Sequence, residues 1–221
     1  MNPLLLLLRD SWYFFSRHFG MIASLCLPVI LLEALALQLA STWMGETPSA
    51  ASDLLIRLVF YPLYTGALIV FLDSRSSRVS LKKKQIWGLA LLRWPSFAVL
   101  AAFSTLLIML GASLLILPGL WVMSRLAFAE YLLVLDGMSP MDAMKQSFRM
   151  SDGHFLTILC CILLAMGPVW LFEWWAYGEL GERPDTIVSI FVDCLDGFLQ
   201  LFTSVLIFRL FSLLGEPAAE H

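Results

Sequence analysis

The fold of this chain is decided by residues 95–135, PSFAVLAAFSTLLIMLGASLLILPGLWVMSRLAFAEYLLVL, a long and almost entirely apolar stretch. As one α-helix it would be about 60 Å long, because each residue adds about 1.5 Å, whereas the hydrocarbon core of a bilayer is roughly 30 Å thick. We therefore expect a helical hairpin across a membrane. We expect the chain to turn at Pro118 and Gly119, with Gly111 and Ser113 nearby, because proline and glycine end helices.

Four further apolar runs flank this stretch, and each is long enough to cross a membrane as a helix of about 20 residues. They cover residues 19–40, 54–72, 155–175 and 187–214. Together with the hairpin they predict an all-α membrane protein of six transmembrane helices, arranged as three hairpins in a single polytopic domain that covers residues 1–221. The composition agrees, since 14% of the residues are charged, whereas a soluble domain carries about 25%.

An amphipathic segment precedes each of the three outgoing helices, and we expect all three segments to lie along the cytoplasmic face of the membrane. They cover residues 4–17, 82–92 and 139–151. In the third segment, Ser139 can cap a helix and Pro140 suits its first position. Met141, Met144 and Phe148 then form an apolar stripe at helical spacing.

The same order of elements recurs along the chain, which predicts three parallel repeat units. These units cover residues 1–73, 80–136 and 139–214. Residues 11–22 align without gaps with residues 147–158, and the matches include Ser11 with Ser147. Chance similarity among hydrophobic helices is the alternative interpretation of this alignment.

Lysine and arginine residues predict the orientation, because positively charged loops stay in the cytoplasm. With six spans and a cytoplasmic N-terminus, eleven of the 14 Lys and Arg residues would lie on the cytoplasmic side. Arg183 would lie outside, and Arg57 and Arg125 would lie within spans. We therefore expect a multi-pass protein of a bacterial inner membrane with both termini in the cytoplasm.

Six of the ionisable side chains within the predicted spans sit in apolar surroundings, where an unpaired charge costs at least about 2.5–3.5 kcal/mol. They are Arg125, Asp193, Glu33, Asp196, Glu130 and Arg57. We expect them to face the interior of the bundle and to pair. Arg125 falls about 9 Å below the expected outer turn, a depth similar to that of Asp193, so Asp193 is its expected partner. Glu33 and Asp196 are the next candidates.

Two interpretations of this intramembrane polar cluster remain open. The first is a polar cavity that opens outward and binds an anionic group or relays protons. The second is a buried network of ion pairs that fixes the register of the helices. Both require the side chains to point toward one another rather than toward lipid.

The remaining motifs offer no catalytic or metal site. Lys82, Lys83 and Lys84 are suited to hold anionic lipid headgroups, at about 1 kcal/mol per basic residue, although the positive-inside rule explains them equally well. The four cysteines lack the spacing of metal ligands, and no nucleotide-binding or hydrolase motif is present. We therefore expect no catalytic residue, no metal and no cofactor.

A short motif surrounds the expected turn: Leu117-Pro118-Gly119-Leu120-Trp121, then Ser124-Arg125-Leu126, and further on Ala143 and Ser147. It resembles the YciC-type inner-membrane proteins of Gram-negative bacteria, and the resemblance covers most of the chain. A related pattern occurs in membrane domains attached to some glycerophosphodiester phosphodiesterases. The resemblance implies a polytopic inner-membrane protein and supplies no catalytic residues.

The leading functional hypothesis is a non-enzymatic membrane protein that binds lipid or supports the organisation of envelope lipids and proteins. The second is a small transporter or channel subunit that uses a cavity around Arg125. A membrane-embedded enzyme is third, because it would need a nucleophile, a metal site or an acid–base pair at one interface. Membrane lipids are the expected partners, together with further copies of this chain or other membrane proteins, and we expect no nucleic-acid partner.

Overall fold

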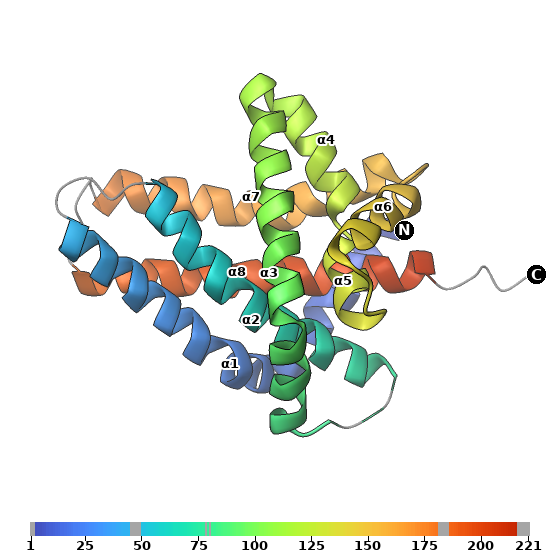
Figure 1. Cartoon of the computed structure of the whole chain (residues 1–221), viewed down its shortest axis with the longest axis horizontal. Coiled ribbons are helices and arrows are strands. Elements are labelled where there is room, and N and C mark those ends of the chain that lie inside the picture. The colour runs from blue at the N-terminus through green and yellow to red at the C-terminus, as the bar shows by residue number, and fades with distance from the viewer. Residues whose placement is uncertain (1–2, 45–49, 78, 80, 181–185, 216–221) are drawn as a thin grey trace, which may run out of the picture.

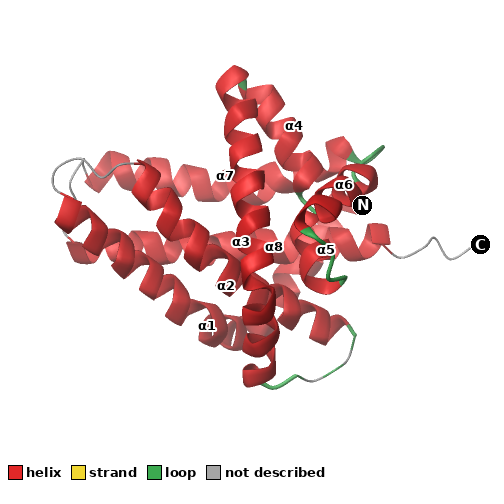
Figure 2. Ribbon diagram, in the orientation of Figure 1, coloured by secondary structure: helices red, strands yellow, loops and turns green. Residues whose placement is uncertain are grey.

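The computed structural model describes residues 3–44, 50–77, 79, 81–180 and 186–215. These residues form eight α-helices and no strand (Figure 2). The helices are α1 (Pro3–Met44), α2 (Ala50–Ser76), α3 (Lys83–Leu114), α4 (Ile116–Leu126), α5 (Ala129–Leu135), α6 (Pro140–Met150), α7 (Phe155–Leu180) and α8 (Thr186–Gly215).

Six stretches of helix among the described residues are long and apolar enough to cross a membrane. Five helices (α1, α2, α3, α7 and α8) supply one each, and α4 and α5 together supply the sixth, Leu117–Leu135. The predicted all-helical architecture and the predicted number of spans are therefore confirmed. Many large apolar side chains are exposed, among them Leu106, Leu110 and Leu171. Such a surface is typical of helices that contact hydrocarbon rather than water.

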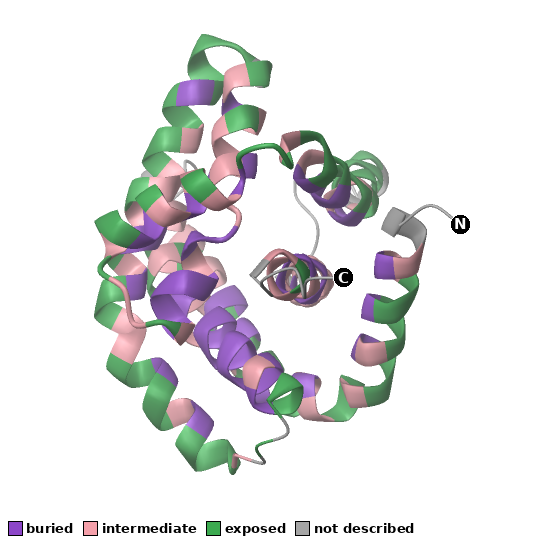
Figure 3. Ribbon diagram, turned by 90° about the vertical axis from the view of Figure 1, so that its right-hand side faces the viewer, coloured by how far each residue is buried: buried purple, intermediate pink, exposed green. Residues whose placement is uncertain are grey.

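Helix α8 lies at the centre of the molecule. Figure 3 shows it end-on, with the other helices arranged around it. Helices α1, α2 and α7 pack against it. Phe15 of α1 is buried in this contact, with its ring centre 5.6 Å from that of Phe198 in α8. The core continues through Phe71, Leu133 and Leu206, which are almost fully buried.

The segments 4–17 and 82–92 are not separate helices. Each is the start of a longer helix, α1 or α3, that continues into its span without a break. A helix ends where a cap or a turn replaces its backbone hydrogen bonds, and the change from polar to apolar residues supplies neither. With 42 residues, α1 is about 63 Å long. Figure 3 shows its first part curving around α8. In this part Leu7 is buried and Arg9 is exposed.

The predicted hairpin is present in α3 and α4, but its turn is three residues earlier than predicted. The chain reverses at Leu115, and Pro118 lies in the first turn of α4, where a missing N–H is tolerated. Gly119 instead lets the two helices approach closely, because a Cβ there would lie 2.9 Å from the Cβ of Ala112. In Figure 1 this hairpin points away from the direction shared by α1, α2, α7 and α8.

Helix α6 begins as predicted. Ser139 is its N-cap and accepts a hydrogen bond from the Asp142 N–H at 3.3 Å, and Pro140 is its first residue. The predicted apolar stripe is only partly correct. Met144 is buried, but Met141 is 54% exposed. The buried face instead consists of Ala143, Met144 and Ser147. Ser147 is buried because its hydroxyl bonds to the backbone of the fourth span.

Candidate functional site

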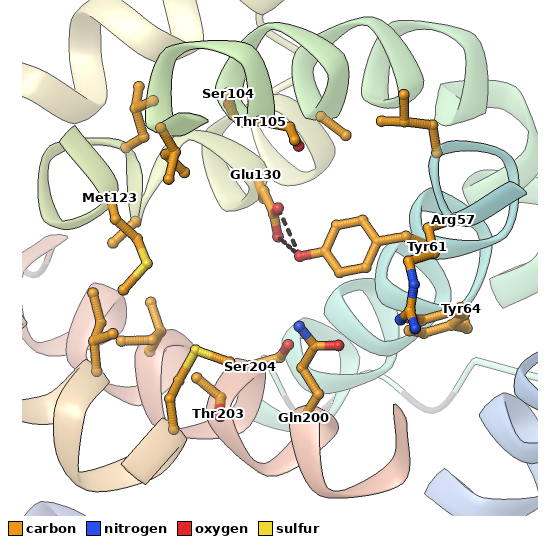
Figure 4. Close-up of a pocket in the computed structure, with 18 of the residues that line it drawn as sticks. Arg57, Tyr61, Tyr64, Ser104, Thr105, Met123, Glu130, Gln200, Thr203 and Ser204 are labelled. Carbon is orange, nitrogen blue, oxygen red and sulfur yellow. Dashed lines mark hydrogen bonds between the residues drawn. The ribbon is translucent and has the colours of Figure 1, made fainter. Parts of the chain in front are cut away.

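A cavity of about 400 Å³ lies between the spans (Figure 4). All six spans contribute to its walls, and α6 does not. Its lining consists of Glu33 of α1; Leu54, Arg57, Leu58, Tyr61 and Tyr64 of α2; Ala101, Ser104, Thr105 and Ile108 of α3; Met123 and Leu126 of α4; Ala127, which follows α4; Glu130 and Tyr131 of α5; Ile162 and Met166 of α7; and Gln200, Thr203, Ser204 and Ile207 of α8. The cavity is therefore formed by the bundle as a whole.

The cavity lies near the middle of the spans. Tyr61 is about 16 Å along α2 and Gln200 about 21 Å along α8, at a rise of 1.5 Å per residue. These helices have 27 and 30 residues, so both side chains are close to half-way. At this depth no lipid headgroup or bulk water lies beside a polar group, so its hydrogen-bonding partners must come from the protein or from the contents of the cavity.

Glu130 and Tyr61 form the central polar contact of the cavity. The Tyr61 hydroxyl donates to both carboxylate oxygens of Glu130, at 2.8 Å to Oε1 and 3.0 Å to Oε2. Tyr61 is held in turn by edge-to-face contacts with Tyr64 and Phe97, whose ring centres lie 5.8 Å and 6.2 Å away. Figure 4 shows the pair reaching toward each other across the cavity from α2 and α5.

Arg57 and Glu33 belong to a second polar group beside the cavity. Arg57 precedes Tyr61 by one helical turn, so the two side chains lie on the same face of α2. Its charge interacts with those of Glu33 on α1 and Asp193 on α8. Glu33 also interacts with Asp196, and its carboxylate accepts a hydrogen bond from Tyr64.

Hydroxyl and amide groups line the other walls of the cavity. Figure 4 shows Ser104 and Thr105 of α3 on one side and Gln200, Thr203 and Ser204 of α8 on the opposite side. The Tyr131 hydroxyl donates to the Ser204 carbonyl oxygen at 2.8 Å and so ties α5 to α8. The cavity therefore offers several neutral hydrogen-bonding groups around two carboxylates, Glu33 and Glu130, and one guanidinium.

The fourth span is broken at Ala127 and Phe128, between α4 and α5. The Ser147 hydroxyl of α6 spans this break, accepting from the Phe128 N–H at 3.2 Å and donating to the Arg125 carbonyl at 2.7 Å. The Ser151 hydroxyl donates to the same carbonyl at 3.1 Å. Backbone groups released from a helix inside a membrane need such partners. The break lets α5 begin a new direction, with Glu130 in its first turn facing the cavity.

Arg125 is paired with Asp152, so the prediction that Asp193 or Glu33 would be its partner is wrong. Its Nη1 also donates to the Phe148 carbonyl at 3.2 Å, and its guanidinium lies 5.4 Å from the centre of the Trp121 ring. The prediction placed Arg125 about 9 Å below the turn. Because the turn is at Leu115, the depth is about 15 Å, which brings Arg125 to the end of α4 beside α6.

The structure thus divides the predicted intramembrane cluster. Glu33, Arg57 and Glu130 line one cavity, Asp193 and Asp196 interact with its Arg57–Glu33 side, and Arg125 does not line it. Three cavity tyrosines were not predicted as site residues. A signal for two of them existed, since Arg57, Tyr61 and Tyr64 have the i, i+4, i+7 spacing of one helix face.

The lysines at positions 82–84 are exposed at the start of α3. The Lys83 ammonium donates to the Ser24 hydroxyl of α1 at 2.9 Å, so one of the three already has a partner within the protein. Their binding of lipid headgroups stays a prediction. Among the described residues, no group of three His, Cys, Asp or Glu side chains is arranged to hold a metal ion.

Comparison with known proteins gives a family but no solved relative. The model of an uncharacterised protein family, UPF0259, matches residues 48–213, a range that contains every cavity residue except Glu33. Proteins named "UPF0259 membrane protein" from Yersinia pestis (strain Pestoides F) and Yersinia pseudotuberculosis serotype O:3 (strain YPIII) are each 27% identical over 157 residues. The aligned region covers 71% of this chain and 61% of each relative.

No solved structure matches the chain. The curated relatives carry the word membrane in their names, which agrees with the six candidate spans. The resemblance to the YciC-type proteins is confirmed, because these proteins are UPF0259 members. With its family model covering residues 48–213, the chain belongs to the UPF0259 family of membrane proteins.

Proposed function

We propose that this protein binds a small organic molecule in the cavity between its spans and acts as a small membrane carrier. The observation that carries the proposal is the cavity of about 400 Å³ at mid-span, with Glu130 and Tyr61 at its centre. The proposal concerns the bundle described above. The chain aligns with 61% of the length of its curated relatives, so the proposal does not extend to the rest of those proteins.

The size and lining of the cavity support ligand binding. Small-molecule sites have volumes of about 300–1,000 Å³ and combine apolar walls with a few convergent polar groups. Here Ile108, Met123 and Ile207 supply apolar wall, and Glu130 and Gln200 supply polar groups. Ionisable residues inside transmembrane segments are costly, and they commonly mark the path of a substrate or an ion.

The broken fourth span also supports a carrier. Binding sites of transporters near the middle of the membrane are typically built around discontinuous helices, because irregular backbone is tolerated only where it is buried or lines a cavity. The break in this chain lies beside the cavity, since Ala127 and Glu130 both line it. A binding site beside the break gives a reason for the interruption of the fourth span, because its apolar sequence could form one continuous helix.

The hypothesis of lipid binding at the lysines has less support than the cavity. The Lys83 ammonium already bonds to Ser24. The cavity, by contrast, brings together polar groups from five of the six spans, and these groups are costly in a membrane unless they have a function. We therefore prefer the carrier to a protein that organises envelope lipids. The expected outward-opening cavity around Arg125 is replaced by one centred on Glu130.

We propose a bacterial inner membrane as the location, with both ends of the described chain on the cytoplasmic side. Support comes from the excess of Lys and Arg in the segments assigned to the cytoplasm. In Figure 1 the start of α1, the end of α8 and the surface helix α6 lie on the same side of the molecule, as this orientation requires.

A cavity-filling variant tests the proposal. Thr105 lines the cavity, whereas its neighbour Leu106 is 59% exposed on the outer surface of α3. The purified wild-type protein, Thr105→Trp and Leu106→Trp would be screened by thermal shift against a library of metabolite-sized amines, carboxylates and neutral molecules. We expect compounds that stabilise the wild type and Leu106→Trp but leave Thr105→Trp unchanged.

The two tryptophan variants control for each other, because they add the same side chain at adjacent positions of one helix. If the compounds found with the wild type stabilise both variants equally, they bind outside the cavity and the proposed function is wrong. If no compound in the library stabilises the wild type, the proposal is also overturned.

A further inference from the structure

The charge of Glu130 is not balanced within the protein. Among the described residues, the ion pairs are Arg9 with Asp10 and Arg125 with Asp152, and neither includes Glu130. Within the described part of the chain, its two carboxylate oxygens receive hydrogen bonds from the Tyr61 hydroxyl alone. A carboxylate removed from water is strongly destabilised unless a positive charge or a proton joins it. The cavity beside it is an open space from which such a group can approach Glu130.

The cation in the cavity wall, Arg57, interacts with acidic residues other than Glu130. These residues are Glu33 and Asp193, and none of the ion pairs among the described residues joins Arg57 to Glu130. In Figure 4 the Arg57 guanidinium lies next to Tyr64, away from the Glu130 carboxylate. The two acidic positions of the cavity therefore differ, since Glu33 has a guanidinium nearby and Glu130 does not.

Three tyrosine side chains contribute to the cavity wall. They are Tyr61, Tyr64 and Tyr131, and the Tyr61 ring is fixed by edge-to-face contacts with Tyr64 and Phe97. The face of a tyrosine ring attracts an ammonium group, by about 0.5–1 kcal/mol when exposed and about 2 when desolvated. A carboxylate beside several tyrosines is suited to an amine or a quaternary ammonium group.

The remaining wall favours an organic cation over a bare ion. Ile108, Met123, Ile162, Met166 and Ile207 supply apolar surface, which would contact a hydrocarbon body but offers no oxygen ligand to a hard metal ion. The described residues also hold no cluster of three metal-ligating side chains. A single proton would satisfy Glu130 without needing a cavity of about 400 Å³.

We propose that the ligand of this cavity is a small organic cation, with its ammonium group on Glu130 and its hydrocarbon part against the apolar wall. This inference rests on the proposed ligand-binding function and adds the chemical class of the ligand. In the bound state the ammonium donates to the carboxylate oxygens, and the Tyr61 hydroxyl keeps the carboxylate oriented toward the cavity.

Three compounds of the same size test the charge preference. They are 2-phenylethylamine, 2-phenylethanol and phenylacetate, which differ in carrying a cation, a neutral hydroxyl or an anion. Isothermal titration calorimetry with wild-type protein is expected to give at least about tenfold tighter binding of the amine than of the other two, a difference of about 1.4 kcal/mol. Equal affinities, or no binding of the amine, overturn the inference.

Carboxylate-to-amide variants locate the preference. Glu130→Gln keeps an acceptor for the Tyr61 hydroxyl and removes the charge, so it should abolish the tenfold preference while leaving the affinity for 2-phenylethanol unchanged. Asp10→Asn changes an exposed carboxylate on α1 that is remote from the cavity wall and should keep the preference. If Glu130→Gln binds the amine as tightly as wild type does, the inference is wrong.

A chemical readout covers the case in which Glu130→Gln does not fold. Dicyclohexylcarbodiimide modifies buried carboxyl groups, and the modified peptide can be located by mass spectrometry. In the wild type, 2-phenylethylamine should protect Glu130 from modification and 2-phenylethanol should protect it much less; equal protection overturns the inference.

These measurements distinguish a failure of the ligand-binding function from a failure of the cation preference. If the three compounds bind equally and Thr105→Trp abolishes all binding, the ligand-binding function stands and the cation preference falls. If Thr105→Trp leaves the binding of all three unchanged, the cavity is not their site and both proposals fall.

Discussion

Arg125 is held at the edge of the bundle rather than at its centre. Its guanidinium contacts Asp152, the Phe148 carbonyl and the Trp121 ring. The Asp152 side chain is 71% exposed, so solvent screens the pair and its contribution to stability is modest. The main effect of the pair is to hold the end of α6 against α4.

A double-mutant cycle tests this assignment. We expect Arg125→Met and Asp152→Asn to show a coupling free energy of about 0.5–1 kcal/mol in thermal or chemical unfolding, as for partly exposed ion pairs. Arg125→Met and Asp193→Asn should be additive within about 0.3–0.5 kcal/mol, as for separate sites. Stronger coupling to Asp193 than to Asp152 would restore the pairing expected from the sequence.

At the scale of elements, the structure depends on α6 bridging the broken fourth span. Ser147 is fully buried and supplies both a donor and an acceptor to the break. The segment between α5 and α6 includes Gly137 with a φ of +68°, and a Cβ there would lie 2.5 Å from an Arg93 nitrogen. Glycine is therefore required where the chain passes Arg93 on its way to α6.

Ser147→Ala should lower the stability of the protein. The change leaves the buried Phe128 N–H without its acceptor, at a cost of about 1–3 kcal/mol. Ser113→Ala is the matched control, because the exposed Ser113 hydroxyl bonds only to the Leu110 carbonyl of its own helix. Unfolding in detergent would be followed for both variants. Equal loss in the two variants would contradict the role of α6.

Helix starts were easier to predict than the break and the turn. Ser139 and Pro140 were identified correctly because a cap and a first-turn proline act within a few residues. The break at Ala127 and Phe128 is stabilised by a serine about twenty residues further along the chain, and no local pattern reports such a contact. Gly119 was assigned to the turn, but it serves close helix packing.

The candidate site was predicted in part for the same reason. Hydropathy identified Glu33, Arg57 and Glu130 because charge is rare in a span. Depth along the sequence then wrongly paired Arg125 with Asp193, and with Glu33 or Asp196 next, since depth depends on the position of the turn. Tyr61 was missed although it shares a helix face with Arg57, because its role depends on a hydrogen bond to Glu130 on another helix.

At the scale of the whole molecule, the six spans surround one cavity, with α8 at the centre of the bundle. The three-unit repeat over residues 1–73, 80–136 and 139–214 stays a prediction. Its aligned serines differ in their contacts, since Ser147 binds the fourth span and the buried Ser11 hydroxyl has no hydrogen-bond partner. The association of further copies of this chain also stays a prediction.

Cysteine labelling tests the orientation of the molecule. In a cysteine-free background, Ser49→Cys, which lies outside the described residues, should react with a membrane-impermeant maleimide added to spheroplasts. Ser77→Cys, at the end of α2, should react only in inverted vesicles or after permeabilisation. Labelling of Ser49→Cys from the cytoplasmic side alone would reverse the proposed orientation.

The most direct test of the central claim is an experimental density map of the protein in lipid nanodiscs with the strongest binder from the compound library. We expect density for the compound inside the bundle, between the Glu130–Tyr61 pair and the Gln200 wall, and a broken fourth span beside it. Density for the compound only on the lipid-facing surface, with protein side chains filling the space between α2, α3, α5 and α8, would contradict the account.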